Sequence, residues 1–354
     1  MTSLDGLFEA LGANARCFAG LDAADFDPEH EWERCQALGI HVMVLGSPEY
    51  PQLLASIPDP PRIIYVRGSL ARLNALAMVG SRQPTSYGCR VVRGLAMEAA
   101  ARGIVVVSGL ARGIDTEAHQ ATLRAGGVTW AVLGSGLDRV YPWENLRLSE
   151  EVVACGGALI SEVPLSGPPA AENFPRRNRI LSGLSWGTVV VEGAQRSGAL
   201  ITARCAAEQG REVFAVPGPV DSTMSRGPHR LLRLGAHLLQ DFQDIMEEIP
   251  ALRAATYGAD ESENGAVSSL HREMGGQEHA AREIPEGGAI AAAVQTALEE
   301  TRGPAGKDGS AAEDGASADV VLVLHQRSIF VMGKLPQVFF IGAKGSLPIM
   351  RILI

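Results

Sequence analysis

An aromatic ring and three arginines stand close together in segment 174–185, which reads FPRRNRILSGLS. The ring is Phe174 and the arginines are Arg176, Arg177 and Arg179. Guanidinium is planar, permanently charged and weakly hydrated, so it can pair with backbone phosphates and stack on bases. The segment therefore indicates single-stranded nucleic acid as a ligand. A basic helix start that only covers a domain surface is the alternative, and this segment alone does not separate the two.

Short polar loops rich in glycine supply further candidate binding groups. Backbone N–H groups in such loops can approach an oxyanion closely, and the N-terminus of a following helix adds partial positive charge. A row of these loops along one sheet edge would form a track for a phosphate backbone. Tight turns between strand and helix need the same glycines, and for any single loop that simpler interpretation is favoured. The loops span residues 80–85, 108–115, 134–136 and 192–203.

Six short apolar runs alternate with segments of helix length and would position these loops. Near-continuous Val, Ile and Leu runs are typical of strands buried on both faces, so their order predicts a doubly wound parallel α/β sheet. Thr85 is predicted to cap a helix that reaches about Arg102, and Asp115 to cap the next helix. Such sheets bind ligands at the carboxyl ends of their strands, where the glycine loops lie. The runs are 76–80, 104–109, 128–134, 158–162, 188–192 and 212–218.

Motifs for nucleotide hydrolysis and hydride transfer are absent from the sequence. No GxxxxGK[ST] segment occurs, and residues 108–115 lack the GxGxxG spacing. The five cysteines are far apart and form neither a CxxC pair nor a Cys/His cluster, which argues against zinc and disulfides. His119 follows Asp115 by four residues, a spacing more typical of a helix-surface pair than of an acid–base dyad. We therefore expect no catalytic residues, no cofactor and no metal.

Charge is divided unevenly along the chain of 354 residues, whose formal net charge is −9. Between Val66 and Gly235 there are 19 arginines, no lysine and 13 acidic residues, a local balance of +6. The basic charge is thus concentrated in the middle of the chain. Arginine without lysine suits bidentate phosphate contacts, although a GC-rich genome would produce the same bias.

Length and composition are those of a globular protein. A hydrophobic content of 46% is enough for a substantial core. No apolar run approaches the roughly 20 residues that cross a bilayer, and the first residues lack the pattern of a signal peptide. We therefore expect a cytoplasmic protein without a membrane partner.

Several segments occur in the same order and at similar spacing in the DNA-processing protein family called DprA or Smf, which the chain resembles from about Trp32 to Pro250. The resemblance implies an extended Rossmann-like fold that binds single-stranded DNA without strong sequence preference and is not an enzyme. It also implies a homodimer that interacts with the RecA recombinase and helps load it on incoming DNA during natural transformation. The segments are 80–85, 108–119, 134–145, 174–185, 189–218 and 225–236.

Carried over residue by residue, the resemblance assigns a DNA groove. Arg82 becomes a phosphate contact and Phe174 a base-stacking aromatic, with a core aromatic as the alternative for the latter. Arg176, Arg177 and Arg179 become groove-lining residues. Stacking contributes about 1 to 3 kcal/mol per base whatever the sequence, which agrees with what the residue types indicate. The other groove residues are Ser81, Ser108, Gly109, Gly113, Ser197 and Gly198, with Asp115, Asn178 and Thr202 as structural residues at the site.

Two stretches in the first 250 residues depart from the family pattern. His229 stands where the family usually has Asn, and a histidine can still donate one hydrogen bond there. Residues 1–65 resemble only the latter half of the family's small helical domain and the lead into the sheet, with no complete pair of helices before Trp32. The sequence thus predicts a truncated helical region over 1–65 and a Rossmann-like core over 66–250.

The end of the chain departs further. Residues 251–319 are rich in Ala, Gly, Glu and Asp and are expected to be a partly disordered linker. Residues 320–354 turn apolar, with strand-like runs at 320–324 and 337–342 but no recognisable winged helix, which many family members carry. An altered reading frame, an appendage and an edge strand all stay open for this irregular tail.

One enzyme class remains as an alternative function. Phosphoribohydrolase-like enzymes of the related Rossmann-like group share glycine loops and a basic phosphate site, and their PGGxGTxxE segment supplies a catalytic glutamate. The corresponding region here reads EGAQRSGALITA, and Glu192 precedes the glycine turn. We therefore expect a single-stranded DNA-binding recombination mediator, not a nucleotide-processing enzyme.

Overall fold

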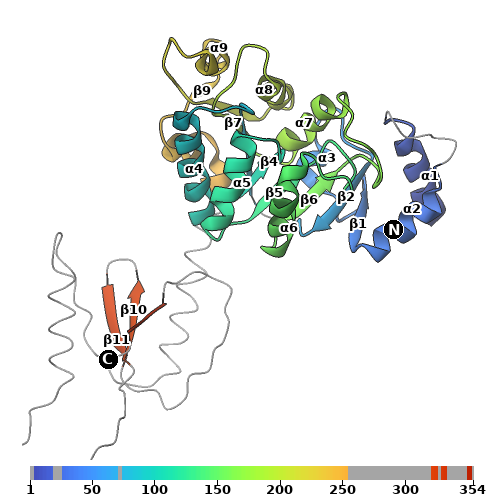
Figure 1. The fold of residues 1–354 in the computed structure, drawn as a ribbon, viewed down its shortest axis with the longest axis horizontal. Helices are drawn as coiled ribbons and strands as arrows, with labels where there is room; N and C mark the ends of the chain where they lie inside the picture. The colour runs from blue at the N-terminus through green and yellow to red at the C-terminus, as the bar shows by residue number, and fades with distance from the viewer. Residues whose placement is uncertain are drawn as a thin grey trace, which may run out of the picture. The chain divides into compact units, whose positions relative to one another are not determined.

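The structure is a computed structural model that describes residues 4–18, 26–70, 74–253, 320–325, 328–332 and 349–352 (Figure 1). The chain divides into two units, residues 1–266 and 267–354. In the second unit, β10 (Val320–His325) pairs antiparallel with β11 (Ser328–Met332) and β12 (Ile349–Ile352). The run at 320–324 is thus a strand, as the sequence predicts. The run at 337–342 and nearly all of the expected linker lie outside the described residues.

A nine-stranded sheet forms the centre of the first unit, in the order β1-β2-β6-β5-β4-β3-β7-β8-β9. Neighbouring strands from β6 to β9 are parallel, and β2 and β1 add antiparallel at one edge. All six predicted runs are strands, β3 to β8, so the doubly wound α/β prediction is confirmed. The strands are β1 (Ile40–Val44), β2 (Ile63–Gly68), β3 (Ala75–Val79), β4 (Val105–Ser108), β5 (Thr129–Val132), β6 (Ala158–Ser161), β7 (Gly187–Val190), β8 (Glu212–Ala215) and β9 (His237–Leu238).

Helices cover both faces of this sheet (Figure 1). They are α1 (Leu4–Ala15), α2 (Pro28–Ala37), α3 (Gln52–Ala55), α4 (Ser86–Ala101), α5 (Ile114–Arg124), α6 (Leu146–Ala154), α7 (Asn173–Gly183), α8 (Gly198–Glu208), α9 (Arg226–Arg233) and α10 (Phe242–Glu248), with short 3-10 helices η1 (Trp143–Asn145) and η2 (Thr223–Ser225). Val106 of β4 packs with α4, α5 and α10, whereas its neighbours Val105 and Val107 pack with α3, α7 and α8. Because successive strand residues face opposite sides, a strand covered on both sides must be apolar throughout.

Two helices precede the sheet, and the second contains Trp32, so α1 is the one helix described that is complete before that residue. α1 is hard to predict because it contains two glycines, which weaken helix propensity. α2 begins after Asp27, whose side chain accepts hydrogen bonds from the N–H groups of Glu29 and His30. Leu7, Leu11 and Cys35 share a buried cluster with strand residues. Since β1 pairs with β2 and β2 pairs with β6, the sheet starts before residue 65.

The glycine loops after β3 and β4 end where the helices α4 and α5 begin. Thr85 caps α4, as predicted, and its hydroxyl accepts a hydrogen bond from the Gly88 N–H group. The cap predicted for Asp115 was wrong, because α5 begins after Gly113, whose φ of 80° favours glycine. Asp115 lies in the first turn of α5, and its carboxylate accepts from the Gly109 N–H group at 3.1 Å. A hydrogen bond across the loop, between residues six positions apart, thus takes the place of the expected N-cap.

Candidate nucleic-acid interface

The carboxyl ends of the parallel strands bring the predicted loops to one edge of the sheet. The loops follow β5, β4, β3 and β7, which are neighbours in that order. Adjacent strands lie about 4.8 Å apart, so the four loops form a continuous row. The helices α5, α4 and α8 begin directly after three of them. The structure therefore brings together segments that are separated by more than a hundred residues in the sequence.

Arg82 and Phe174 meet in this row. Arg82 is exposed, and its Cζ atom lies 5.8 Å from the centroid of the half-buried Phe174 ring. A second aromatic, Tyr141, packs against the same ring with centroids 5.7 Å apart and planes at 57°. A cation beside an aromatic ring is the pairing that a phosphate and a neighbouring base would contact. Phe174, however, already has two neighbours, so only part of its ring is open to a ligand.

Arg177 lies inside the protein, 6% exposed, and not along the groove as the sequence predicted. Its Nη1 atom donates to the carbonyl of Gly109 at 2.8 Å and also to that of Val132. A Cβ atom at Gly109 would lie 2.6 Å from the guanidinium, so this close approach requires glycine. The assignment of Arg177 as a groove-lining residue is corrected accordingly, since it supports the loop after β4 from behind.

Arg177 and Asp115 form a buried pair of opposite charges around Gly109. Burial raises the pKa of Asp115 to about 6, against the attraction of Arg177 and the hydrogen bond from Gly109. Burial likewise lowers the pKa of Arg177 to about 10, against the attraction of Asp115. Each side chain therefore depends on the other to remain charged in the interior.

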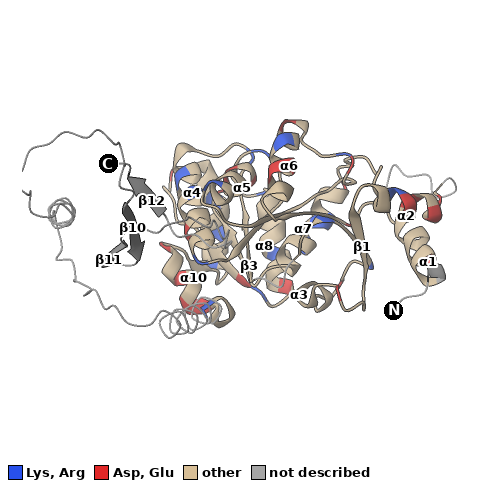
Figure 2. Ribbon diagram, turned by 90° about the horizontal axis from the view of Figure 1, so that it is seen from below, with Lys and Arg blue, Asp and Glu red and all other residues tan. Residues whose placement is uncertain are grey.

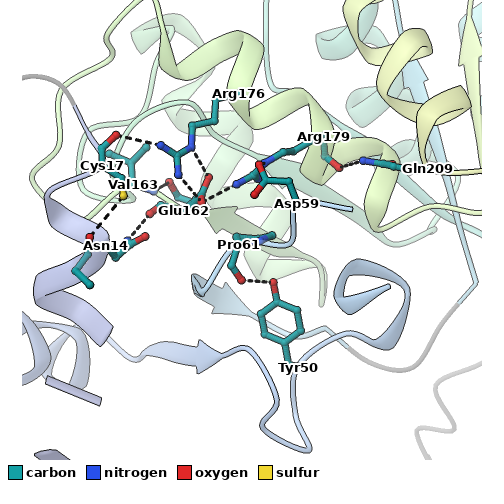
Figure 3. Close-up of polar contacts among 12 residues, drawn as sticks. Asn14, Cys17, Tyr50, Asp59, Pro61, Glu162, Val163, Arg176, Arg179 and Gln209 are labelled. Carbon is teal, nitrogen blue, oxygen red and sulfur yellow. Dashed lines mark hydrogen bonds and ion pairs between the residues drawn. The ribbon is translucent and has the colours of Figure 1, made fainter. Parts of the chain in front are cut away.

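Arg176 and Arg179 both bind Glu162, a carboxylate that is 4% exposed at the end of β6 (Figure 3). Glu162 Oε1 lies 3.0 Å from Arg176 Nη2 and 2.7 Å from Arg179 Nη2. Arg179 also pairs with Asp59 at 2.9 Å. These two arginines of α7, a helix marked partly blue in Figure 2, are thus ion-paired within the chain. Groove contact by either one would require Glu162 to release it.

The same cluster ties the N-terminal segment to α7 (Figure 3). Arg176 Nη1 donates to the carbonyl of Cys17 at 3.0 Å, and its Cζ lies 4.6 Å from the centroid of the Phe18 ring. Asn14 Nδ2 donates to the Glu162 carbonyl at 2.8 Å. The helix that carries Phe174 is therefore fixed by residues from the start of the chain.

Ser81 and Ser108 are buried and shape their turns. The Ser81 hydroxyl accepts from the Gln83 N–H group at 3.1 Å. The Ser108 hydroxyl donates to the Met78 carbonyl at 2.6 Å. In this structure both hydroxyls are engaged with the backbone, so their side chains hold the loops after β3 and β4 in place.

The loop after β7 ends at Ser197, the N-cap of α8. Gly198 begins the helix and is exposed. Asn178 Nδ2 and Thr202 Oγ1 both donate to the Gly198 carbonyl, at 3.3 and 3.4 Å. Asn178 and Thr202 thus both contact the first residue of α8, which fits the structural role predicted for them. Ser197 Oγ is buried without a hydrogen-bond partner among the described residues.

Two exposed aromatics in the loop after β5 were missed by the sequence reasoning. Tyr141 is 39% exposed and Trp143 is 75% exposed. The signal was present, because the motif over 134–145 places Tyr-Pro-Trp beyond a predicted strand and a glycine turn, with four residues in between. Aromatics at the ligand-binding edge of a parallel sheet are candidates for stacking.

His229 and Glu192 show how the remaining predicted positions are used. His229 Nε2 lies 3.0 Å from the Gly218 carbonyl, so the histidine makes a hydrogen bond at the position where the resemblance implies Asn. Glu192 is buried and accepts from the N–H group and the hydroxyl of Thr85, at 2.8 and 2.5 Å. It also lines a cavity of about 310 Å³ with Tyr87 and Asp221.

The described part of the chain lacks the features of a metal site and of a membrane span. No group of three or more His, Cys, Asp or Glu side chains there could hold a metal ion. None of the helices in this part combines the length and the hydrophobicity that a membrane span requires.

His119 is fully buried behind the loops, so the predicted surface pair with Asp115 was wrong. Thr129 Oγ1 donates to the Val106 carbonyl at 2.6 Å and therefore accepts from His119 Nδ1, which lies 2.7 Å away. Burial, together with the charge of Arg177, lowers the pKa of His119 to about 3. The imidazole is thus neutral in the folded protein.

Acid should destabilise the protein through His119. Below the ordinary pKa of 6.5 the unfolded chain binds a proton that the folded chain excludes, so stability falls as the pH falls towards 3. The loss is at most about 1.4 kcal/mol per pH unit. His119→Asn keeps a donor for Thr129 but does not titrate. Urea unfolding at about pH 7 and about pH 5 should show a larger loss for wild type than for His119→Asn. Equal losses would contradict this account.

The chain is similar to one protein family and to several of its members. Residues 41–250 match the family model for DNA recombination-mediator protein A. Protein Smf of Escherichia coli (strain K12) is 50% identical over 211 residues, which cover 59% of this chain and 56% of the relative. DNA processing protein DprA of Bacillus subtilis (strain 168) is 44% identical over 215 residues, covering 60% and 72%. The chain thus spans a little over half the length of the Escherichia coli relative.

Solved structures match the fold of the first unit. The X-ray structure of DNA processing protein A from Streptococcus pneumoniae has a TM-score of 0.58 and 36% identity, covering 68% of this chain and 86% of that one. A structure of DNA processing protein A from Helicobacter pylori, which concerns the single-stranded DNA binding mode of that protein, has a TM-score of 0.52 and 28% identity. It covers 59% of this chain and 95% of the other. Both matches support the α/β fold.

Proposed function

The chain belongs to the DNA recombination-mediator protein A family, and on that premise we propose that it binds single-stranded DNA along the carboxyl edge of its parallel sheet. It acts in the cytoplasm as a homodimer that protects incoming DNA and helps load RecA during natural transformation, and it is not an enzyme. The single-stranded DNA binding mode studied in the Helicobacter pylori relative supports the choice of ligand.

The observation that carries the proposal is the contact between Arg82 and Phe174. Arg82 is the one predicted groove arginine that is exposed and has no ion pair among the described residues. Its guanidinium can neutralise a phosphate while the open part of the Phe174 ring receives a base. The neighbouring loops add backbone N–H groups and helix N-termini, which favour anions. Ser197, Gly198 and Gly113 belong to these loops. Arg177 contributes as a support of the loop after β4 and not as a contact.

Arg82→Ala should weaken binding of an oligo-dT strand by roughly 10- to 100-fold, because a charge-assisted hydrogen bond contributes about 1.5 to 3 kcal/mol. The slope of log affinity against log salt should become shallower by about 0.7, the value for one phosphate of a single strand. Fluorescence anisotropy of a labelled strand at several salt concentrations measures both quantities.

The matched control is Arg204→Ala, which removes an exposed arginine of α8 that pairs with Glu208. This variant should bind as wild type does. If Arg82→Ala and wild type bind equally, the site is misassigned. If wild type binds duplex more tightly than single-stranded DNA, or binds neither, the proposed function is wrong.

A phosphoribohydrolase-like activity is the competing function, favoured only by the cavity beside Glu192. Both oxygens of that carboxylate accept hydrogen bonds from Thr85, which holds them at the start of α4. A catalytic glutamate must be free to act on its substrate. Incubation with AMP and chromatography for free adenine tests this alternative, and clear turnover would overturn the assignment as a non-enzyme.

A further inference from the structure

Trp143 presents an indole to water that the fold does not use. Its exposed fraction of 75% contrasts with 5% for Trp130, and Trp32 and Trp186 are half-buried. Burial is the usual state of so large an apolar side chain, so an exposed indole on a ligand-binding edge points to a binding role.

The turn that carries Trp143 is held on both sides. Asn145 Nδ2 donates to the Leu110 carbonyl at 2.9 Å and to Thr116 Oγ1 at 2.8 Å, which anchors the turn to the segment after β4. Glu144 pairs with Arg112 at 2.5 Å. Before the turn, Tyr141 packs on Phe174. The backbone around Trp143 is therefore fixed at the sheet edge while its indole stays free, as a preorganised contact requires.

We propose that Trp143 is a second base-stacking platform for single-stranded DNA, beside Phe174. The inference rests on the proposed function and extends it to a residue outside the predicted site. Phe174 offers only part of its ring, because Arg82 and Tyr141 contact it and a Cβ atom at Gly134 would lie 2.8 Å from it. Trp143 follows Tyr141 by two residues, at most about 7 Å of chain. One strand can therefore contact both platforms while Arg82 neutralises its backbone.

A protein partner is the other class of occupant that an exposed indole could serve. Leu146, which is 52% exposed and starts α6, adds apolar surface close by. The same turn nevertheless carries charged groups, namely Glu144, which follows Trp143 in the chain, and its partner Arg112, whose side chain is 54% exposed. Nucleic acid suits this mixture of an aromatic face and exposed arginine better than an apolar protein surface does.

The test compares Trp143→Leu and Trp143→Phe on an oligo-dT strand and on a strand of the same length with abasic positions. Trp143→Leu should weaken oligo-dT binding roughly 5- to 100-fold, the effect of losing one stacked base. Trp143→Phe should recover most of that loss because it restores an aromatic face. On the abasic strand both variants should match wild type. Oligo-dT should also quench the tryptophan fluorescence of wild type, and Trp143→Phe should remove most of the quenching.

Leu146→Ala, a neighbouring exposed apolar residue, is the matched control and should bind as wild type does. Unchanged oligo-dT binding by Trp143→Leu, an equal loss on the abasic strand, or an equal loss in Leu146→Ala would each overturn the inference. If wild type binds oligo-dT and Arg82→Ala weakens that binding while Trp143→Leu does not, only the role of Trp143 fails. If wild type binds no oligonucleotide, the proposed function fails first.

Discussion

Replacing Arg177 by alanine is expected to lower the free energy of unfolding by about 3 to 5 kcal/mol, because a hydrogen bond to a charged group contributes about 1.5 to 3 kcal/mol and the guanidinium makes two of them inside the protein. The substitution leaves the carboxylate of Asp115 in the interior without its partner. It also leaves the carbonyls of Gly109 and Val132 without the donor that the guanidinium supplies. Urea unfolding followed by circular dichroism at neutral pH measures the loss.

Two further variants serve as controls for the stability loss of Arg177→Ala. Arg204→Ala removes an arginine whose side chain is 79% exposed, and its effect should stay within about 0.5 kcal/mol. Adding Asp115→Asn to Arg177→Ala should recover part of the loss, because the double variant no longer buries an unpaired charge. A loss below about 1 kcal/mol in Arg177→Ala would show that the pair does not hold the loop as described.

Glu162→Ala should cost about 3 kcal/mol of stability, near the lower end for a buried ion pair. Its carboxylate serves two arginines at once, so both guanidiniums lose their buried partner. The side chain of Arg176 is 35% exposed and can be hydrated, which keeps the loss from being larger. Glu162→Gln should cost less, since the amide oxygen still accepts a hydrogen bond. Thermal and urea unfolding of both variants measure these differences.

Glu150→Ala is the matched control, because Glu150 pairs with Arg67 at 2.5 Å while its side chain is 50% exposed. It should change stability by less than about 1 kcal/mol. The Glu162→Gln protein also tests the groove role that the sequence predicts for Arg176 and Arg179. A higher DNA affinity of Glu162→Gln than of wild type would show that the guanidiniums of Arg176 and Arg179, once released, contact phosphates. An unchanged affinity would restrict both to support of the fold.

The parts of the fold that could be predicted from the sequence are those set by local patterns. The six strands β3 to β8 are short apolar runs between helices, and the Thr85 cap depends on residues three positions apart. β1 and β2 were not predicted as strands of the sheet, and four of the five residues of β1 are not fully buried. A half-exposed edge strand lacks the continuous apolar run that marks a central one.

The positions of the candidate site residues depended on contacts between distant parts of the chain. The arginine cluster predicts a basic surface. The acidic partners of these arginines, Glu162, Asp59 and Asp115, come from other segments, so no local sequence pattern indicates the pairing. Phe174 was selected from its residue type beside the arginines, and Arg82 was added by the resemblance. Trp143 was not selected, since it lies beyond the glycine turn over 134–136 and outside the arginine cluster, the two patterns on which the selection rested.

The inward guanidinium of Arg177 joins three separate pieces of backbone: α7, the turn after β4 and the end of β5. An engineer who transplanted residues 108–115 alone into another sheet would leave behind the side chain that gives this turn its shape. Insertions or exchanges in one of these pieces are therefore expected to need matching changes in the other two. We expect the turn after β4, the end of β5 and α7 to change together, unlike the independently variable loops of many scaffolds.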